Sequence, residues 1–178
     1  MNREVLSAAA GYDVSRETYD ALMGFHREFT DWSKRINLVA PSTENEFWQR
    51  HVADSLQLLS IKPAAKSWVD LGSGGGFPGM IIAIALDTLD DSRVTLVESN
   101  RKKCAFLQMA RSKFAPRTTV VPSRIEDAAS AIRPPDVVTA RALADLSKLL
   151  SLSQSWLRNG AVGLFPKGRG YAQEIENS

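Results

Sequence analysis

A cluster of glycines between an apolar strand and an apolar helix constrains this chain more than any other feature. Residues 68–71 form a short, mostly apolar run, five glycines follow between positions 72 and 79, and residues 80–86 are again apolar. Glycine lets the backbone turn sharply with positive φ and approach a ligand closely. A strand, a glycine turn and a helix in this order build the nucleotide-binding corner of an open α/β sheet. The segment therefore predicts a nucleotide-binding α/β fold.

The order of residues within this turn favours one kind of nucleotide. A dinucleotide-binding G-x-G-x-x-G/A fingerprint would start at Gly72 and Gly74, and its third small residue would fall at position 77, which is Phe77. Asp70, two residues before the first glycine, completes the pattern D-x-G-x-G-x-G instead. That pattern suits the zwitterionic tail of S-adenosylmethionine. We therefore expect S-adenosylmethionine as the cofactor, with Asp70, Gly72 and Gly74 among the residues that bind it.

The remainder of the chain divides into a helical part and a part in which strands and helices alternate. From residue 67 onward we expect strands at 67–71, 93–98, 118–121, 136–140 and 161–165, with helices at 78–89, 101–114, 125–132 and 143–157. This alternation predicts a mostly parallel sheet with helices on both faces. A further helix begins at Tyr171, and because such sheets usually end in more strands, we expect C-terminal strands to be missing.

Residues 1–62 are predicted to form an N-terminal helical extension, and 63–178 the sheet domain. Ser15 can cap a helix whose apolar side chains recur at three- and four-residue steps as far as Ile36. Thr43 and Glu46 form a capping-box pattern that would open a second helix through His51 to Leu59.

Composition excludes several classes of protein. The longest apolar run, residues 80–86, is much shorter than the roughly 20 residues that span a bilayer. With no signal-peptide core at the N-terminus, we expect a cytoplasmic protein without a membrane partner. The single Cys104 excludes an internal disulfide, and two histidines are too few for a zinc cluster, so we expect no metal. Nothing indicates an obligate oligomer, and a monomer is expected.

Two strand ends carry candidate nucleoside-binding residues. Glu98 closes the second strand, where an acidic side chain can accept hydrogen bonds from both ribose hydroxyls, although a solvated strand end is the simpler alternative. Ile125 and Glu126 follow the third strand, where methyltransferase folds place an apolar residue on the adenine ring and a polar group beside its amino group. Glu126 could equally be a first-turn residue stabilised by the helix dipole.

Arg141 ends the fourth strand, where the transferred group should lie. Its planar guanidinium suits a carboxylate, a phosphate or the edge of a guanine, and a structural ion pair with Asp70 or Asp145 is the alternative. The sequence contains neither an Asn/Asp-Pro-Pro-Tyr motif for exocyclic amines nor a Pro-Cys nucleophile for pyrimidine rings. Lys167 and Arg169, beyond the last strand, are expected to contact RNA phosphates.

Several motifs together resemble one family. They are Trp32-x-x-x-x-Asn37-Leu38, Arg50-His51-x-x-Asp54-Ser55-Leu56, Asp70-Leu71-Gly72-x-Gly74-x-Gly76-Phe77-Pro78-Gly79, Ser123-Arg124-x-Glu126 and Arg141-Ala142. In this order they are similar to the RsmG (GidB) family of bacterial 16S rRNA guanine-N7 methyltransferases. The resemblance implies a Rossmann-like class I S-adenosylmethionine-dependent methyltransferase fold. It also implies methyl transfer to N7 of one guanosine, position 527 of 16S rRNA, in the small ribosomal subunit or its assembly intermediate. Cofactor residues carried over by the resemblance are Gly72, Phe77, Ile125, Glu126 and Arg141, with Glu98 as the ribose acid.

The implied chemistry agrees with the residues. Guanine N7 carries an in-plane lone pair, so its methylation needs neither a general base nor a covalent intermediate, and His51 is not assigned as a base. The reaction depends chiefly on aligning N7, methyl and sulfur. Alternatives are a methyltransferase with another RNA or a small-molecule substrate, a nicotinamide oxidoreductase, and a non-catalytic RNA-binding module.

Overall fold

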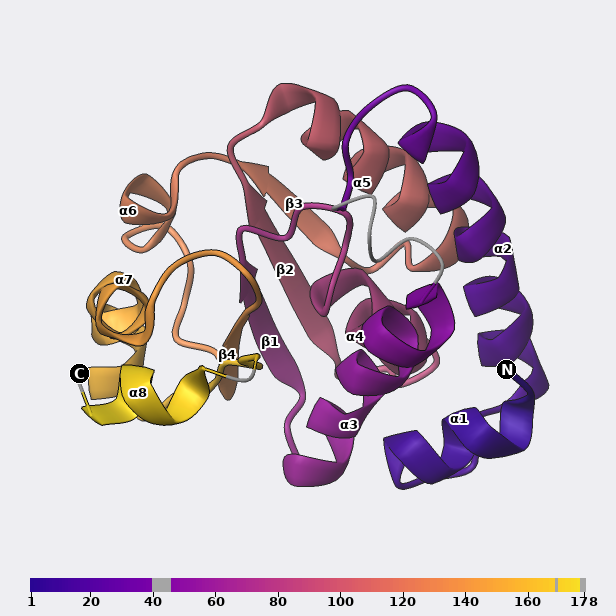
Figure 1. Ribbon diagram of the computed structural model, residues 1–178, viewed down its shortest axis with the longest axis horizontal. Coiled ribbons are helices and arrows are strands. Elements are labelled where there is room, and N and C mark those ends of the chain that lie inside the picture. The colour runs from indigo at the N-terminus through magenta and orange to yellow at the C-terminus, as the bar shows by residue number, and fades with distance from the viewer. Residues whose placement is uncertain (40–45, 169, 177–178) are drawn as a thin grey trace.

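A five-stranded parallel sheet forms the centre of the computed structural model, which describes residues 1–39, 46–168 and 170–176 (Figure 1). The strands lie in the order β3-β2-β1-β4-β5. Their bounds are Ser67–Leu71 for β1, Arg93–Glu98 for β2, Thr119–Pro122 for β3, Val137–Ala140 for β4 and Val162–Leu164 for β5. The predicted parallel sheet is confirmed, with β1 and β2 as expected, β3 one residue later than predicted, and β4 and β5 shorter. The chain leaves β1 toward β2 on one side and later enters β4 on the other, so the topological switch lies between β1 and β4.

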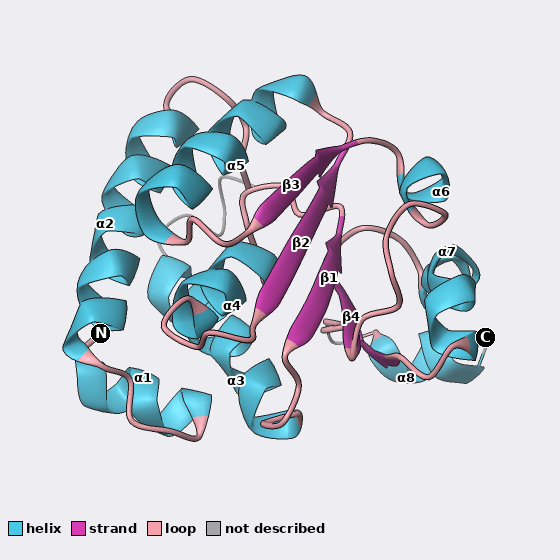
Figure 2. Ribbon diagram, turned by 180° about the vertical axis from the view of Figure 1, so that it is seen from behind, coloured by secondary structure: helices cyan, strands magenta, loops and turns pink. Residues whose placement is uncertain are grey.

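Helices cover both faces of this sheet, as predicted (Figure 2). Side chains of β1 alternate between the two faces: Trp68 packs with the N-terminal helices and α4, whereas Val69 packs with α7 on the opposite side. The helices that connect the strands are α4 (Gly79–Leu86), α5 (Arg101–Phe114), α6 (Ile125–Ala128) and α7 (Leu146–Arg158), and α8 (Tyr171–Glu176) follows β5.

Three of these helices are shorter than predicted. Helix α4 ends at Leu86 instead of 89, and α6 ends at Ala128 instead of 132. Helix α7 begins at Leu146 instead of 143 because Asp145 is its N-cap, with Oδ1 accepting a hydrogen bond from the Lys148 N–H at 2.8 Å.

The N-terminal segment contributes α1 (Arg3–Ala10), α2 (Arg16–Ser33), the π-helix η2 (Phe47–Ala53) and α3 (Asp54–Ile61). Ser15 caps α2 as predicted, since its Oγ accepts a hydrogen bond from the Thr18 N–H at 3.1 Å. The predicted second helix is an α-helix only from Asp54 onward, because the preceding turns have π geometry. Thr43 of the predicted capping box lies outside the described residues.

The division of the chain at residue 62 stays a prediction, but the two parts share one apolar core. Leu22 and Phe25 of α2 belong to the same buried cluster as Met80 and Ile81 of α4. Within residues 1–39, 46–168 and 170–176, every helix is too short or too polar to cross a membrane.

Candidate active site

The glycine loop between β1 and α4 lies at the carboxyl ends of the strands. Gly72, Gly74 and Gly76 have φ values of +65°, +54° and +90°, which other residues rarely adopt. A Cβ on Gly72 would also lie 2.7 Å from Cδ1 of Leu143. The loop is held by its neighbours, because the Gly74 N–H donates to Oε2 of Glu98 at 2.9 Å. Glycine is therefore required here both by the turn and by close packing, as the sequence indicated.

Asp70 lies beneath this loop. The residue is 1% exposed, and its Oδ2 accepts from the Gly79 N–H at 3.2 Å while its Oδ1 accepts from Oγ1 of Thr139 at 2.9 Å. Burial raises the pKa of Asp70 to about 6, and hydrogen bonds from neighbours oppose that rise. Asp70 lines neither of the two cavities beside the loop. A direct contact between Asp70 and the cofactor stays a prediction, and the structure gives Asp70 a place in supporting the loop.

One cavity beside the loop, of about 420 Å³, has the composition of a nucleoside site. Glu98 lines this cavity, and its Oε1 accepts from the Asn100 N–H at 2.7 Å. Ile125, Glu126 and Leu143 are among its other lining residues. The structure thus brings together the three residues predicted for ribose and adenine, which arise from two different strand ends.

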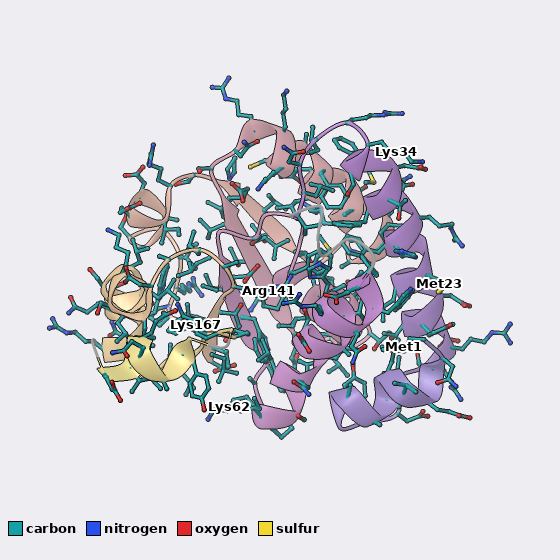
Figure 3. All side chains as sticks on the ribbon, viewed as in Figure 1. Met1, Met23, Lys34, Lys62, Arg141 and Lys167 are labelled. Atoms are coloured by element: carbon teal, nitrogen blue, oxygen red, sulfur yellow. The ribbon has the colours of Figure 1, made fainter. Side chains whose placement is uncertain are left out.

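A second cavity, of about 530 Å³, is lined by the same loop. Both cavities are lined by Gly72, Gly74, Lys103, Ala142 and Ala144, so they adjoin. The second cavity is also lined by Phe77, Arg141 and Lys167, three more of the predicted site residues. Arg141 and Lys167 are labelled in Figure 3. Arg169 lies outside the described residues.

Arg141 is fixed in this second cavity by three contacts. Its Nη1 donates to the Arg50 carbonyl oxygen at 2.6 Å, and its Nη2 lies 2.6 Å from Nδ1 of His51. The guanidinium carbon lies 5.3 Å from the centroid of the Phe77 ring, a cation–π contact. Burial lowers the pKa of Arg141, while the charges of Asp70 and Asp54 oppose that change. The alternative of a direct ion pair with Asp70 or Asp145 is not what the structure shows.

Lys167 and Asp54 supply further charges to this cavity. Lys167 Nζ lies 2.6 Å from Oε2 of Glu174 and donates to the Ala144 carbonyl at 2.7 Å. The Lys167 ammonium is therefore paired within the chain, and its contact with an RNA phosphate stays a prediction. Burial raises the pKa of Asp54, and the nearby Arg141 and Arg50 oppose that rise.

Several residues of the site were missed by sequence reasoning, among them Lys103, His51 and Asp54. Lys103 lines both cavities, and a cue to it is its position in the first turn of the helix after Glu98. His51 and Asp54 were noticed in a motif but given no role, since a lone histidine on a helix is most often a packed residue. Among the described residues, no group of three or more His, Cys, Asp or Glu side chains could hold a metal ion.

Two solved structures with a similar fold are named as methyltransferases. Precorrin-6y C5,15-methyltransferase from Geobacter metallireducens matches with a TM-score of 0.56 and 16% identity, covering 79% of this chain and 70% of that one. The O-methyltransferase from Bacillus cereus in complex with SAH matches with a TM-score of 0.54 and 14% identity, covering 92% and 76%. The chain therefore has the Rossmann-like fold of the class I methyltransferases, as predicted.

Sequence relatives narrow this class to one family. The model of the GidB family, described as rRNA small subunit methyltransferase G, matches residues 18–178. A relative named ribosomal RNA small subunit methyltransferase G from Chelativorans sp. (strain BNC1) is 53% identical over 173 residues, covering 97% of this chain and 82% of the relative. One of the same name from Rhizobium meliloti is 48% identical, covering 100% and 85%. The chain belongs to the GidB family, which confirms the resemblance found in its motifs.

Proposed function

We propose that this protein transfers a methyl group from S-adenosylmethionine to N7 of a single guanosine, at position 527 of 16S rRNA in the small ribosomal subunit. The observation that carries the proposal is the pair of adjoining cavities that are both lined by the glycine loop. One has an acid and apolar walls suited to adenosine. The other has Arg141 and an aromatic ring and is large enough for a base.

The residues of the first cavity fit S-adenosylmethionine. Glu98 is 8% exposed, and its two oxygens are held by backbone N–H groups, so the carboxylate is preorganised to accept hydrogen bonds from ribose hydroxyls. Ile125 and Leu143 provide apolar surface for the adenine ring. When bound, the cofactor supplies a methyl group on a sulfonium centre, which is a good leaving group.

The residues of the second cavity orient the target. In the proposed step, the N7 lone pair forms a bond to the methyl carbon while the carbon–sulfur bond breaks and its electrons return to sulfur. No proton moves, so the chain needs no general base. Arg141 and Phe77 contribute by holding the base and the donor in line, and such alignment can supply roughly 7–11 kcal/mol at its upper range.

The proposed partner is the small ribosomal subunit or an assembly intermediate of it, and the protein acts as a monomer. A ribosomal substrate implies that the reaction takes place in the cytoplasm. The net charge of +2 is compatible with RNA and does not by itself identify it.

The test is a labelling experiment. The protein is incubated with radiolabelled S-adenosylmethionine and small subunits that lack 7-methylguanosine, and the digested RNA is mapped. We expect label at one 7-methylguanosine in 16S rRNA, with the R141A variant strongly impaired. Label at another base or in another RNA would contradict the proposed substrate. Calorimetric titrations with S-adenosylhomocysteine and with NADH distinguish a methyltransferase from an oxidoreductase. We expect S-adenosylhomocysteine to bind and NADH not to bind.

A further inference from the structure

The π-helix η2 leaves a backbone carbonyl open toward the second cavity. The N–H of Asp54 donates to the Gln49 carbonyl, five residues earlier, whereas an α-helix would direct it to Arg50. The Arg50 carbonyl thus loses its usual donor, and Nη1 of Arg141 takes that place at 2.6 Å. The next carbonyl, that of His51, accepts a hydrogen bond from Oγ of Ser55. The widened turn therefore provides a hydrogen-bond acceptor for the Arg141 side chain.

The His51 ring provides a second hydrogen-bond acceptor for Arg141. Nη2 of Arg141 lies 2.6 Å from Nδ1 of His51. A guanidinium can only donate hydrogen bonds, so Nδ1 must accept. The His51 ring is therefore neutral and carries its proton on Nε2. A protonated ring would instead present an N–H to a permanent cation.

The His51 ring is also oriented by packing. It is 5% exposed and lies nearly parallel to the Phe77 ring, with centroids 4.6 Å apart and an interplanar angle of 21°. Phe77 is the same ring that lies beneath the Arg141 guanidinium. His51 and Arg141 are therefore held together over one aromatic residue of the glycine loop, beside the position proposed for the donor methyl group.

We propose that His51 is a positioning residue that acts through Arg141. In its neutral, Nε2-protonated form, it fixes the guanidinium in the orientation needed for methyl transfer. The kinetic part of this inference rests on the proposed function, whereas the protonation state of His51 does not. The competing explanation is that His51 only fills space against Phe77.

The protonation state can be measured without substrate. The chain has only two histidines, so long-range proton–nitrogen correlation spectra of the ¹⁵N-labelled protein at neutral pH give two imidazole patterns, which the H26Q variant assigns. We expect His51 to show an unprotonated Nδ1 and a protonated Nε2. We also expect this pattern to change in R141A. A proton on Nδ1 of His51 in the wild-type protein would overturn the proposal.

Two substitutions distinguish the role of His51 as a hydrogen-bond acceptor from its role as an aromatic ring. H51N keeps an acceptor oxygen at the position of Nδ1 and loses the ring, whereas H51F keeps the ring and loses the acceptor. We expect H51F to lower kcat/KM for methylation by about tenfold or more and H51N to retain most of the wild-type value. Thermal unfolding of both variants shows whether either has lost its fold.

A double-substitution cycle tests whether His51 acts through Arg141. Adding H51F to R141A should change the remaining rate by less than about twofold, because the interaction is already absent. An equal loss from H51F in both backgrounds, or a wild-type rate in H51F, would overturn the positioning role. If the wild-type protein itself methylated no guanosine, the proposed function would fail, while the spectra would still decide the protonation state.

Discussion

Replacing Asp70 by asparagine should stabilise this protein at neutral pH, although it removes a carboxylate from beneath the glycine loop. The amide is the same size and can satisfy the same partners. Its oxygen can accept from the Gly79 N–H, and its NH₂ group can donate to the Thr139 hydroxyl oxygen, whose own proton is then available to the Val69 carbonyl at 3.5 Å. D70N therefore changes the charge of the site and little of its packing.

The size of the effect follows from the pKa of Asp70, which burial raises from 3.8 to about 6. Between these values the unfolded chain has released the proton while the folded chain still binds it, so stability falls as the pH rises. The shift of about two pH units corresponds to roughly 3 kcal/mol of stability lost when the pH lies well above 6. About 1.4 kcal/mol of this is regained on lowering the pH from 7.5 to 5.

Urea denaturation followed by tryptophan fluorescence would test this, since Trp68 and Trp156 are both buried. The unfolding free energies of the wild-type protein and D70N are compared at each pH from 5 to 7.5, so that the contributions of other ionisable groups cancel in the difference. We expect D70N to be the more stable, with an advantage that grows with pH. The control is D136N. Hydrogen bonds from the backbone N–H groups of Ser67 and Lys66 lower the pKa of Asp136, so the stability that the Asp136 charge contributes is lost only at a pH below the range measured. A wild-type-to-D70N difference that stays constant with pH would refute the reasoning.

Three further substitutions test the loop and the two cavities. G79A places a Cβ 2.4 Å from Cδ2 of Leu96 and should cost about 1–3 kcal/mol, measured as a lower melting temperature. E98Q puts an NH₂ group where an oxygen now accepts a backbone N–H from Gly74 or Asn100, so it should lower the melting temperature and reduce the calorimetric affinity for S-adenosylhomocysteine by about tenfold; an unchanged affinity would contradict the role of Glu98. E174Q removes the charge paired with Lys167. The slope of the logarithm of the binding constant for small subunits against the logarithm of the salt concentration should then steepen by roughly one. An unchanged slope would mean that the freed ammonium contacts no phosphate.

The sequence predicted the parts of the fold that depend on local pattern. Strands β1 (SWVDL) and β2 (RVTLVE) are short segments in which Val, Leu and Trp make up half or more of the residues, and a glycine-rich turn separates β1 from α4. Because the carboxyl ends of parallel strands share one edge, the order of motifs was sufficient to predict that Glu98, Ile125 and Arg141 come near one loop. The structure places each of them beside the cavities that adjoin at that loop.

The contacts of Arg141 depend instead on a long-range pairing that no local pattern contains. Its acceptors, at positions 50 and 51, are about 90 residues away in the chain. The π geometry that opens the Arg50 carbonyl is a one-residue change in hydrogen-bond register, and an apolar periodicity of three and four residues does not distinguish it from an α-helix. Asp70 was ambiguous for a related reason, since a carboxylate at a strand end can face either a ligand or the helix beneath the loop.

The N-terminal helices therefore belong to the site as well as to the core. Phe47 at the start of η2 packs against Phe29 of α2 and against Phe77 of the glycine loop, with centroids 5.1 Å and 5.6 Å apart. This aromatic packing holds η2 at the carboxyl edge of the sheet, where its carbonyl and imidazole can reach Arg141. A chain that began at residue 63 would retain the glycine loop and Glu98, but it would lack both hydrogen-bond acceptors of the guanidinium. In the proposed function, cofactor binding therefore depends on the sheet and its connecting helices, whereas target positioning depends on these together with the N-terminal helices.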